Sequence, residues 1–71
     1  MKILLIGSGG REHSLAIKLK ESSRLTKLYI APGNAGTAQV GENIPIKETE
    51  TDELLAFAKK EAIDITVVGP E

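Results

Sequence analysis

A short apolar run that stops on a cluster of glycines constrains the fold of this chain more than any other feature. Residues 3–6 are apolar at every position, which is typical of a strand buried on both faces of a parallel sheet. Gly7-Ser8-Gly9-Gly10 follows directly, and residues 11 to about 22 are good helix formers with an apolar stripe at Leu15, Ala16 and Leu19. The segment therefore predicts a strand, a tight glycine turn and a helix.

The rest of the chain repeats this alternation. We expect a second strand over residues 27–31, a loop through Thr37, an irregular stretch over 39–48, a helix that begins near Thr51 and runs to about Ala62, and a third strand over 63–68. The order β-α-β-α-β indicates an α/β, Rossmann-like parallel sheet whose ligand loops lie at the carboxyl ends of the strands. Those loops are residues 7–12, 32–37 and 69–71. The third strand is free to pair beside the first strand or beyond the second.

Size and composition limit the classes of protein to which this chain can belong. A chain of 71 residues allows one small domain whose core is marginal by itself, which favours a part of a larger protein. The net charge of −1 without a long basic run argues against a nucleic-acid partner, and the first apolar run is too short for a signal peptide or a membrane span. The absence of Cys excludes disulfides and thiol nucleophiles and fits a reducing cytosol.

The glycine turn is suited to an anion. Backbone N–H groups of such a turn, at the positive end of a helix dipole, bind phosphate well, although glycines at this place also serve tight packing alone. A Walker A loop is excluded because no Lys lies between Lys2 and Lys18. The dinucleotide fingerprint matches at Gly7 and Gly9 but has Glu12 at its last position, which disfavours NAD and leaves FAD or a mononucleotide open.

The polar residues near these loops each allow two interpretations, one as ligand-binding groups and one without a ligand. Arg11, Glu12 and His13 are placed to reach a ligand over the turn, or else the first two form a solvated pair and His13 packs beside Ile17. Residues 32–37 either approach a polar ligand or only connect two elements. Glu71 either binds hydroxyl or amine groups at the rim or is an exposed residue.

Four motifs together resemble one family. They are residues 6–13 (IGSGGREH), 31–37 (APGNAGT), 56–58 (AFA) and 67–71 (VVGPE), and they are similar to the amino-terminal domain of the phosphoribosylamine-glycine ligase family, also called glycinamide ribonucleotide synthetases. The resemblance implies a cytoplasmic enzyme of de novo purine biosynthesis. Such a ligase uses ATP and magnesium (or manganese) to activate glycine as an acyl phosphate, which the amine of 5-phosphoribosylamine then attacks.

The resemblance also implies how the parts are divided. Residues 1–71 would be the amino-terminal part of the substrate-binding domain, an incomplete pre-ATP-grasp domain. The ATP-grasp and carboxyl-terminal domains, which bind ATP and the metal, would lie outside this chain. No catalytic residue and no metal ligand is therefore assigned here, and the isolated chain is expected to be inactive and to self-associate through uncovered apolar surface.

Carried over by position, the family's substrate site falls on the loops at the carboxyl ends of the strands. The turn would take the substrate 5′-phosphate, and the second loop with Glu71 would line the ribosyl-amine site. The predicted substrate-binding residues are Gly7, Ser8, Gly9, Gly10, Arg11, Glu12, Pro32, Gly33, Asn34, Gly36, Thr37 and Glu71. The alternative is a free-standing, non-catalytic module that binds a nucleotide or phosphate, and the sequence that follows Glu71 in the gene would distinguish the two.

Overall fold

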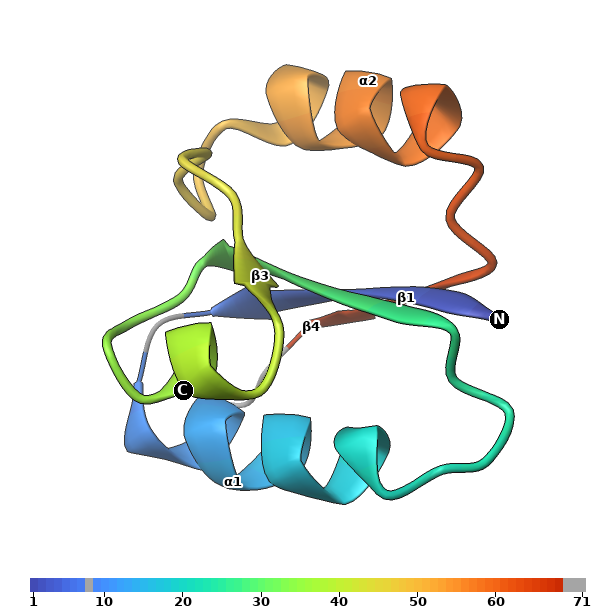
Figure 1. Ribbon diagram of the computed structural model, residues 1–71. Helices are drawn as coiled ribbons and strands as arrows, with labels where there is room; N and C mark the ends of the chain where they lie inside the picture. The colour runs from blue at the N-terminus through green and yellow to red at the C-terminus, as the bar shows by residue number, and fades with distance from the viewer. Residues whose placement is uncertain (8, 69–71) are drawn as a thin grey trace.

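Four parallel strands form one sheet in the order β3-β2-β1-β4, and a helix covers each face, as the computed structural model shows for residues 1–7 and 9–68 (Figure 1). The elements in chain order are β1 (Lys2–Gly7), α1 (Gly10–Lys20), β2 (Lys27–Pro32), the 3₁₀ turn η1 (Thr37–Gln39), β3 (Glu42–Asn43), α2 (Thr51–Lys60) and β4 (Ile65–Val68). The predicted Rossmann-like α/β class is confirmed.

The strand order settles where the last strand pairs. β1 pairs with β2 on one side and with β4 on the other, so that Ile6 lies between Ala31 and Val68 in the register. The chain therefore moves outward from β1 through β2 to β3 and then returns, through α2, to the opposite side of β1. Of the two places left open by the sequence, β4 takes the one beside the first strand.

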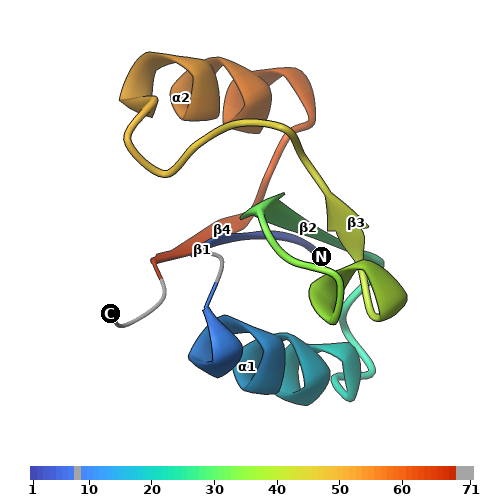
Figure 2. The same ribbon diagram turned by 90° about the vertical axis from the view of Figure 1, so that its left-hand side faces the viewer.

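Two apolar layers hold the helices to the sheet, and Figure 2 shows the helices on opposite sides of it. On the α1 side, Ala16 packs against buried residues of β1 and β2, as the predicted stripe required. On the α2 side, Leu54 packs over Leu4 and Tyr29, and the Tyr29 and Phe57 rings meet edge to face with centroids 5.0 Å apart. Because both helices lie over β1 and β2, these two strands carry the core.

The boundaries differ from expectation in three places. The stretch predicted as irregular contains β3, which pairs with β2, and the loop before it contains η1. Helix α2 begins at Thr51 as expected, and the side chain of its N-cap residue Glu50 accepts a hydrogen bond from the Lys47 N–H (2.8 Å). The helix ends before Ala62, whose φ of 54° is left-handed and cannot continue a right-handed helix. The last strand begins at Ile65, two residues later than predicted.

The free edge at β4 leaves apolar surface exposed. Ile65 and Val68 are 45% and 72% exposed, and Leu55 on α2 is 58% exposed. A small apolar hollow of about 130 Å³ lies between α2 and the β1–β4 side of the sheet, with Leu4, Ile6, Leu54, Leu55, Ala58, Thr51 and Thr66 around it. The expected uncovered apolar surface is thus present, and self-association remains a prediction.

Candidate functional site

The turn after β1 and the loop after β2 are joined by direct hydrogen bonds. The Gly33 N–H donates to the Gly7 carbonyl (3.0 Å), and the Asn34 side-chain amide donates to the Gly9 carbonyl (3.2 Å). Parallel strands end at the same edge of the sheet, which is why two loops 25 residues apart in the chain meet here. The structure therefore brings together the two loops that the sequence predicted as one site.

The amino terminus of α1 opens into this pair of loops. Gly9 is its N-cap residue, with an extended φ of −83° and ψ of 178°, and Gly10 is the first helical residue. By helix geometry, the N–H groups of Gly10, Arg11 and Glu12 have no acceptor within the helix, because the first intrahelical bond here runs from the His13 N–H to the Gly9 carbonyl (3.4 Å). This backbone can receive an anion at the positive end of the helix dipole. Ser8 lies outside the described residues.

The loop after β2 is held by its own polar side chains. The Asn34 N–H donates to the Thr37 hydroxyl (2.7 Å), and the Thr37 N–H donates to the Asn34 side-chain oxygen (3.0 Å). Thr37 is completely buried, so its side chain lies inside the loop and its hydroxyl is engaged there. The predicted role of Asn34 and Thr37 in substrate binding is not tested by these contacts, which give Thr37 a structural role.

Two glycines of this loop sit where a side chain would not fit. Gly33 has a φ of 76°, and a Cβ atom there would lie 2.7 Å from the Thr37 hydroxyl and closer still to the Asn43 side chain. A Cβ atom on Gly36 would lie 2.6 Å from His13 Nδ1. The His13 ring thus lies against the loop, a packing that the sequence analysis did not include among the alternatives for this residue.

Of the remaining predicted residues, the structure describes Pro32 and does not describe Glu71. Pro32 ends β2 and is paired with Gly7 in the register, directly beside the turn. Glu71 lies outside the described residues. Val68, the last described residue, is paired with Ile6, so β4 ends at the same edge of the sheet as the turn.

Asn43 is the residue that the sequence analysis missed. It lies on β3, and its side chain accepts from the Thr37 hydroxyl and donates to the Asn34 carbonyl, both at 2.8 Å. The sequence around it shows neither the alternation of a strand nor a turn motif. Only the pairing of β3 with β2 brings it to the loop.

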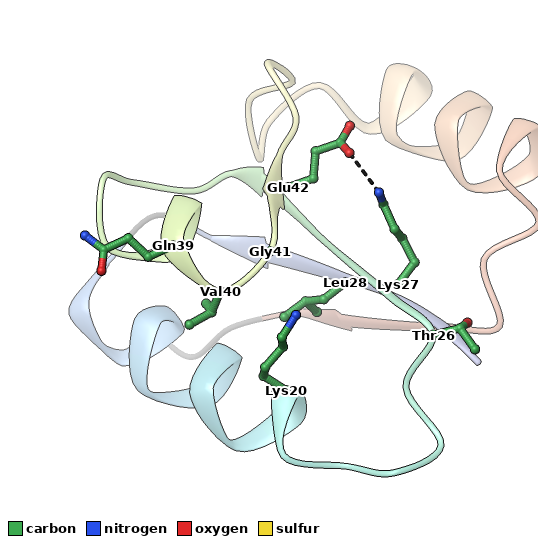
Figure 3. Close-up of a pocket in the computed structure, with 8 residues that line it drawn as sticks. All are labelled: Lys20, Thr26, Lys27, Leu28, Gln39, Val40, Gly41 and Glu42. Atoms are coloured by element: carbon green, nitrogen blue, oxygen red, sulfur yellow. Dashed lines mark ion pairs between the residues drawn. The ribbon is translucent and has the colours of Figure 1, made fainter.

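A separate hollow of about 410 Å³ lies at the other end of β2, as Figure 3 shows. Its lining residues are Lys20, Thr26, Lys27, Leu28, Gln39, Val40, Gly41 and Glu42. Lys27 forms an ion pair with Glu42 (3.2 Å), which raises the pKa of Lys27 through the hydrogen bond and the carboxylate charge. Both side chains are about half exposed, so the pair links two strands at the surface and offers no enclosed charged site.

The described residues form neither a metal-binding cluster nor a membrane-spanning helix. Within residues 1–7 and 9–68, no three His, Cys, Asp or Glu side chains gather closely enough to hold a metal ion. No helix in the same part of the chain has the length and apolar character needed to cross a membrane.

The comparison with known families gives one description for the whole chain. Residues 1–71 match the family described as "Phosphoribosylglycinamide synthetase, N domain". The phosphoribosylamine-glycine ligase of Xylella fastidiosa (strain 9a5c) is 59% identical over 73 aligned residues, and that of Caldanaerobacter subterraneus subsp. tengcongensis is 51% identical over 71. All of this chain is covered in both cases.

Among solved structures, the crystal structure of phosphoribosylamine-glycine ligase from Thermotoga maritima is similar, with a TM-score of 0.59 and 32% identity. The match covers 73% of this chain and 13% of that one. The chain spans about 17% of the length of the curated relatives named above. The similarity therefore concerns one amino-terminal portion of much longer proteins.

Proposed function

The chain belongs to the phosphoribosylglycinamide synthetase N-domain family, and from that membership we propose that it is the amino-terminal part of a phosphoribosylamine-glycine ligase. The complete enzyme would join glycine to 5-phosphoribosylamine at the expense of ATP, giving glycinamide ribonucleotide in de novo purine biosynthesis. Its substrates are small molecules, and its place is the cytoplasm, which suits a chain without Cys. The relatives of 51–59% identity, aligned over the whole chain, support the proposal.

Within that enzyme, this chain holds the phosphoribosyl group. The observation that carries this assignment is the hydrogen bonding of the second loop to the glycine turn, at Gly7 and Gly9, beside the amino terminus of α1. Backbone N–H groups of the turn and the first helical turn take the phosphate, because they point donors at an anion without a side chain in the way. The loop over residues 32–37 lies against the ribosyl-amine end of the same ligand.

ATP and its magnesium ion belong to another part of the enzyme in this proposal. The described residues do not fit the metal, since they contain no cluster of three carboxylate or imidazole ligands. They also contain no Gly-Lys-Ser/Thr sequence for a triphosphate. In this proposal the nucleotide and the metal bind in the parts of the enzyme that its amino-terminal portion does not include, and no residue of this chain is given a catalytic role.

The test uses the full-length ligase with Gly10→Val. A branched Cβ at the first position of α1 crowds the backbone donors, so the Michaelis constant for phosphoribosylamine should rise much more than the constants for ATP and glycine. Ala56→Val is the matched control, because it adds the same branched side chain at an exposed helical position on α2, on the other face of the sheet. Equal effects on all three substrates, or none, would remove the phosphate from this turn.

A further inference from the structure

Asn43 joins the outermost strand to the loop after β2 through two of its side-chain atoms. Its Oδ1 accepts from the Thr37 hydroxyl and its Nδ2 donates to the Asn34 carbonyl, both at 2.8 Å. The two contacts reach residues three positions apart. The side chain therefore clamps both ends of the turn that residues 34–37 form.

The polar groups of this cluster satisfy one another. The Thr37 hydroxyl has a single proton, which Asn43 Oδ1 (2.8 Å) and the Asn34 carbonyl (3.0 Å) can both accept, and the contact with Asn43 is the shorter; the hydroxyl oxygen accepts from the Asn34 N–H (2.7 Å). The Asn43 amide then donates to the Asn34 carbonyl. No buried side-chain nitrogen or oxygen among the described residues is left without a partner, and Thr37 is fully buried. A connected network of this kind favours one geometry, because each bond in it constrains the groups that make the next one.

The packing around the cluster leaves the loop little freedom. The Asn43 carboxamide and the Thr37 hydroxyl fill the space that a Cβ atom at position 33 would occupy. The loop can approach β3 this closely only with glycine at position 33. The position of Asn43 and the path of the loop therefore depend on each other.

The loop is in turn bonded to the glycine turn, so the position of one affects the other. Asn34, whose backbone Asn43 holds, donates from its own side chain to the Gly9 carbonyl (3.2 Å). Gly9 is the N-cap residue of α1, so its carbonyl and the first-turn N–H groups belong to one rigid segment. A shift of Asn34 would move its contact with the segment that is proposed to hold the phosphate.

We propose that Asn43 is a positioning residue for the phosphoribosyl site, acting through Thr37 and Asn34 on the glycine turn without contacting the ligand. This inference rests on the proposed function, which supplies the ligand. It explains why a polar residue on a two-residue edge strand turns its side chain toward the loop instead of toward water.

The decisive variant is Asn43→Asp in the full-length ligase. The carboxylate still accepts from the Thr37 hydroxyl, but an oxygen now faces the Asn34 carbonyl where a donor stood. The Michaelis constant for phosphoribosylamine should rise by about tenfold, the order of effect expected when one hydrogen bond at a partly buried carbonyl is lost. The constants for ATP and glycine and the turnover number should stay near those of the unmodified enzyme. The matched control is Glu42→Gln, the neighbouring exposed residue on the same strand, which should change none of these values.

A second variant guards against simple misfolding. Thr37→Val has a similar shape without the hydroxyl and should reproduce the effect of Asn43→Asp. Hydrogen exchange without any substrate gives an independent measure of the loop. Amides of residues 33–38 should exchange faster in Asn43→Asp and Thr37→Val, and not in Glu42→Gln.

The outcomes separate this inference from the proposed function. If Gly10→Val raises the constant for phosphoribosylamine and Asn43→Asp does not, the positioning role is refuted and the site remains. If neither variant changes it while exchange in the loop still quickens, the phosphoribosyl site itself is refuted, and the positioning role is lost with it. A uniform loss of turnover and of affinity for all three substrates would mean that Asn43 supports only the fold.

Discussion

The His13 ring occupies the space that a side chain at position 36 would need. A methyl group on Gly36 would lie 2.6 Å from His13 Nδ1 and 2.7 Å from Cε1. Carbon atoms in ordinary contact lie about 3.5–4.0 Å apart, so the ring would have to retreat by about 1 Å. Overpacking of this kind costs about 1–3 kcal/mol.

The backbone at Gly36 does not add to that cost. Its φ of −69° and ψ of −43° are ordinary right-handed helical values that alanine adopts freely. At such a position Gly→Ala stabilises by about 0.4–1 kcal/mol, through the unfolded state. Gly36→Ala should therefore destabilise the protein by up to about 2.5 kcal/mol where His13 is present. In a His13→Ala background it should stabilise by about 0.4–1 kcal/mol instead.

The assay is a double-mutant cycle on the full-length protein, with the local free energy of opening taken from hydrogen exchange of peptides covering residues 33–43. The amides of Ala38, Val40 and Gly41 report on η1, since they donate to carbonyls of Asn34 and Thr37. The coupling energy between the two substitutions should be about 1–3 kcal/mol. If Gly36→Ala has the same effect in both backgrounds, the ring does not lie against this glycine and the packing argument fails.

The core residues Leu54 and Tyr29 and the free edge at β4 can each be tested by one measurement. Leu54→Ala should lower the stability by about 2–5 kcal/mol, whereas Leu55→Ala, at a residue 58% exposed, should change it by less than about 0.5 kcal/mol, as measured by urea unfolding. Burial, and then the hydrogen bond to Glu61, raise the pKa of the Tyr29 hydroxyl. The contribution of this hydroxyl to the free energy of unfolding is therefore complete below pH 10 and falls as the pH rises through the higher pKa of the folded state. The free energy of unfolding of Tyr29→Phe, measured against pH, should lack this fall. The isolated 71-residue chain should scatter light as more than a monomer because the edge at β4 is uncovered, and a sharply melting monomer would contradict this.

The sequence was sufficient for the parts of the fold that local patterns determine. The apolar run of β1, the glycine turn and the stripe of α1 each carry a strong local signal, and all three were placed within about two residues. Strand β3 was missed because two polar residues, Glu42 and Asn43, show no alternation, and their strand character comes from pairing with Tyr29 and Ile30. The position of β4 was open for a related reason, since pairing between distant segments leaves no trace in either one.

The candidate site, too, could be predicted from the sequence only in part. The two loops could be predicted, because glycines at a strand-to-helix turn and polar residues after the next strand are visible in the sequence. The bonds that join them could not, since they depend on side chains from three elements. Thr37 shows the limit most clearly: its place in the loop could be predicted, whereas the burial of its hydroxyl between Asn34 and Asn43 depends on the pairing of β3 with β2.

The strand order gives a physical reason for the site to lie where it does. The chain leaves β1 toward β2 by way of α1 on one face, and it reaches β4 on the other side of β1 by way of α2 on the opposite face (Figures 1 and 2). The chain thus builds the sheet outward on one side of β1, through β2 to β3, and then on its other side with β4, and ligands of open parallel sheets bind at the carboxyl end of the strands where the strand order reverses in this way. The turn that begins at Gly7 stands at that point, with Val68 ending β4 on one side and Pro32 ending β2 on the other. Within residues 1–7 and 9–68, a further strand lies beyond β2 and none lies beyond β4, and that further strand supplies Asn43. The loop on that side is therefore braced by residues of this chain.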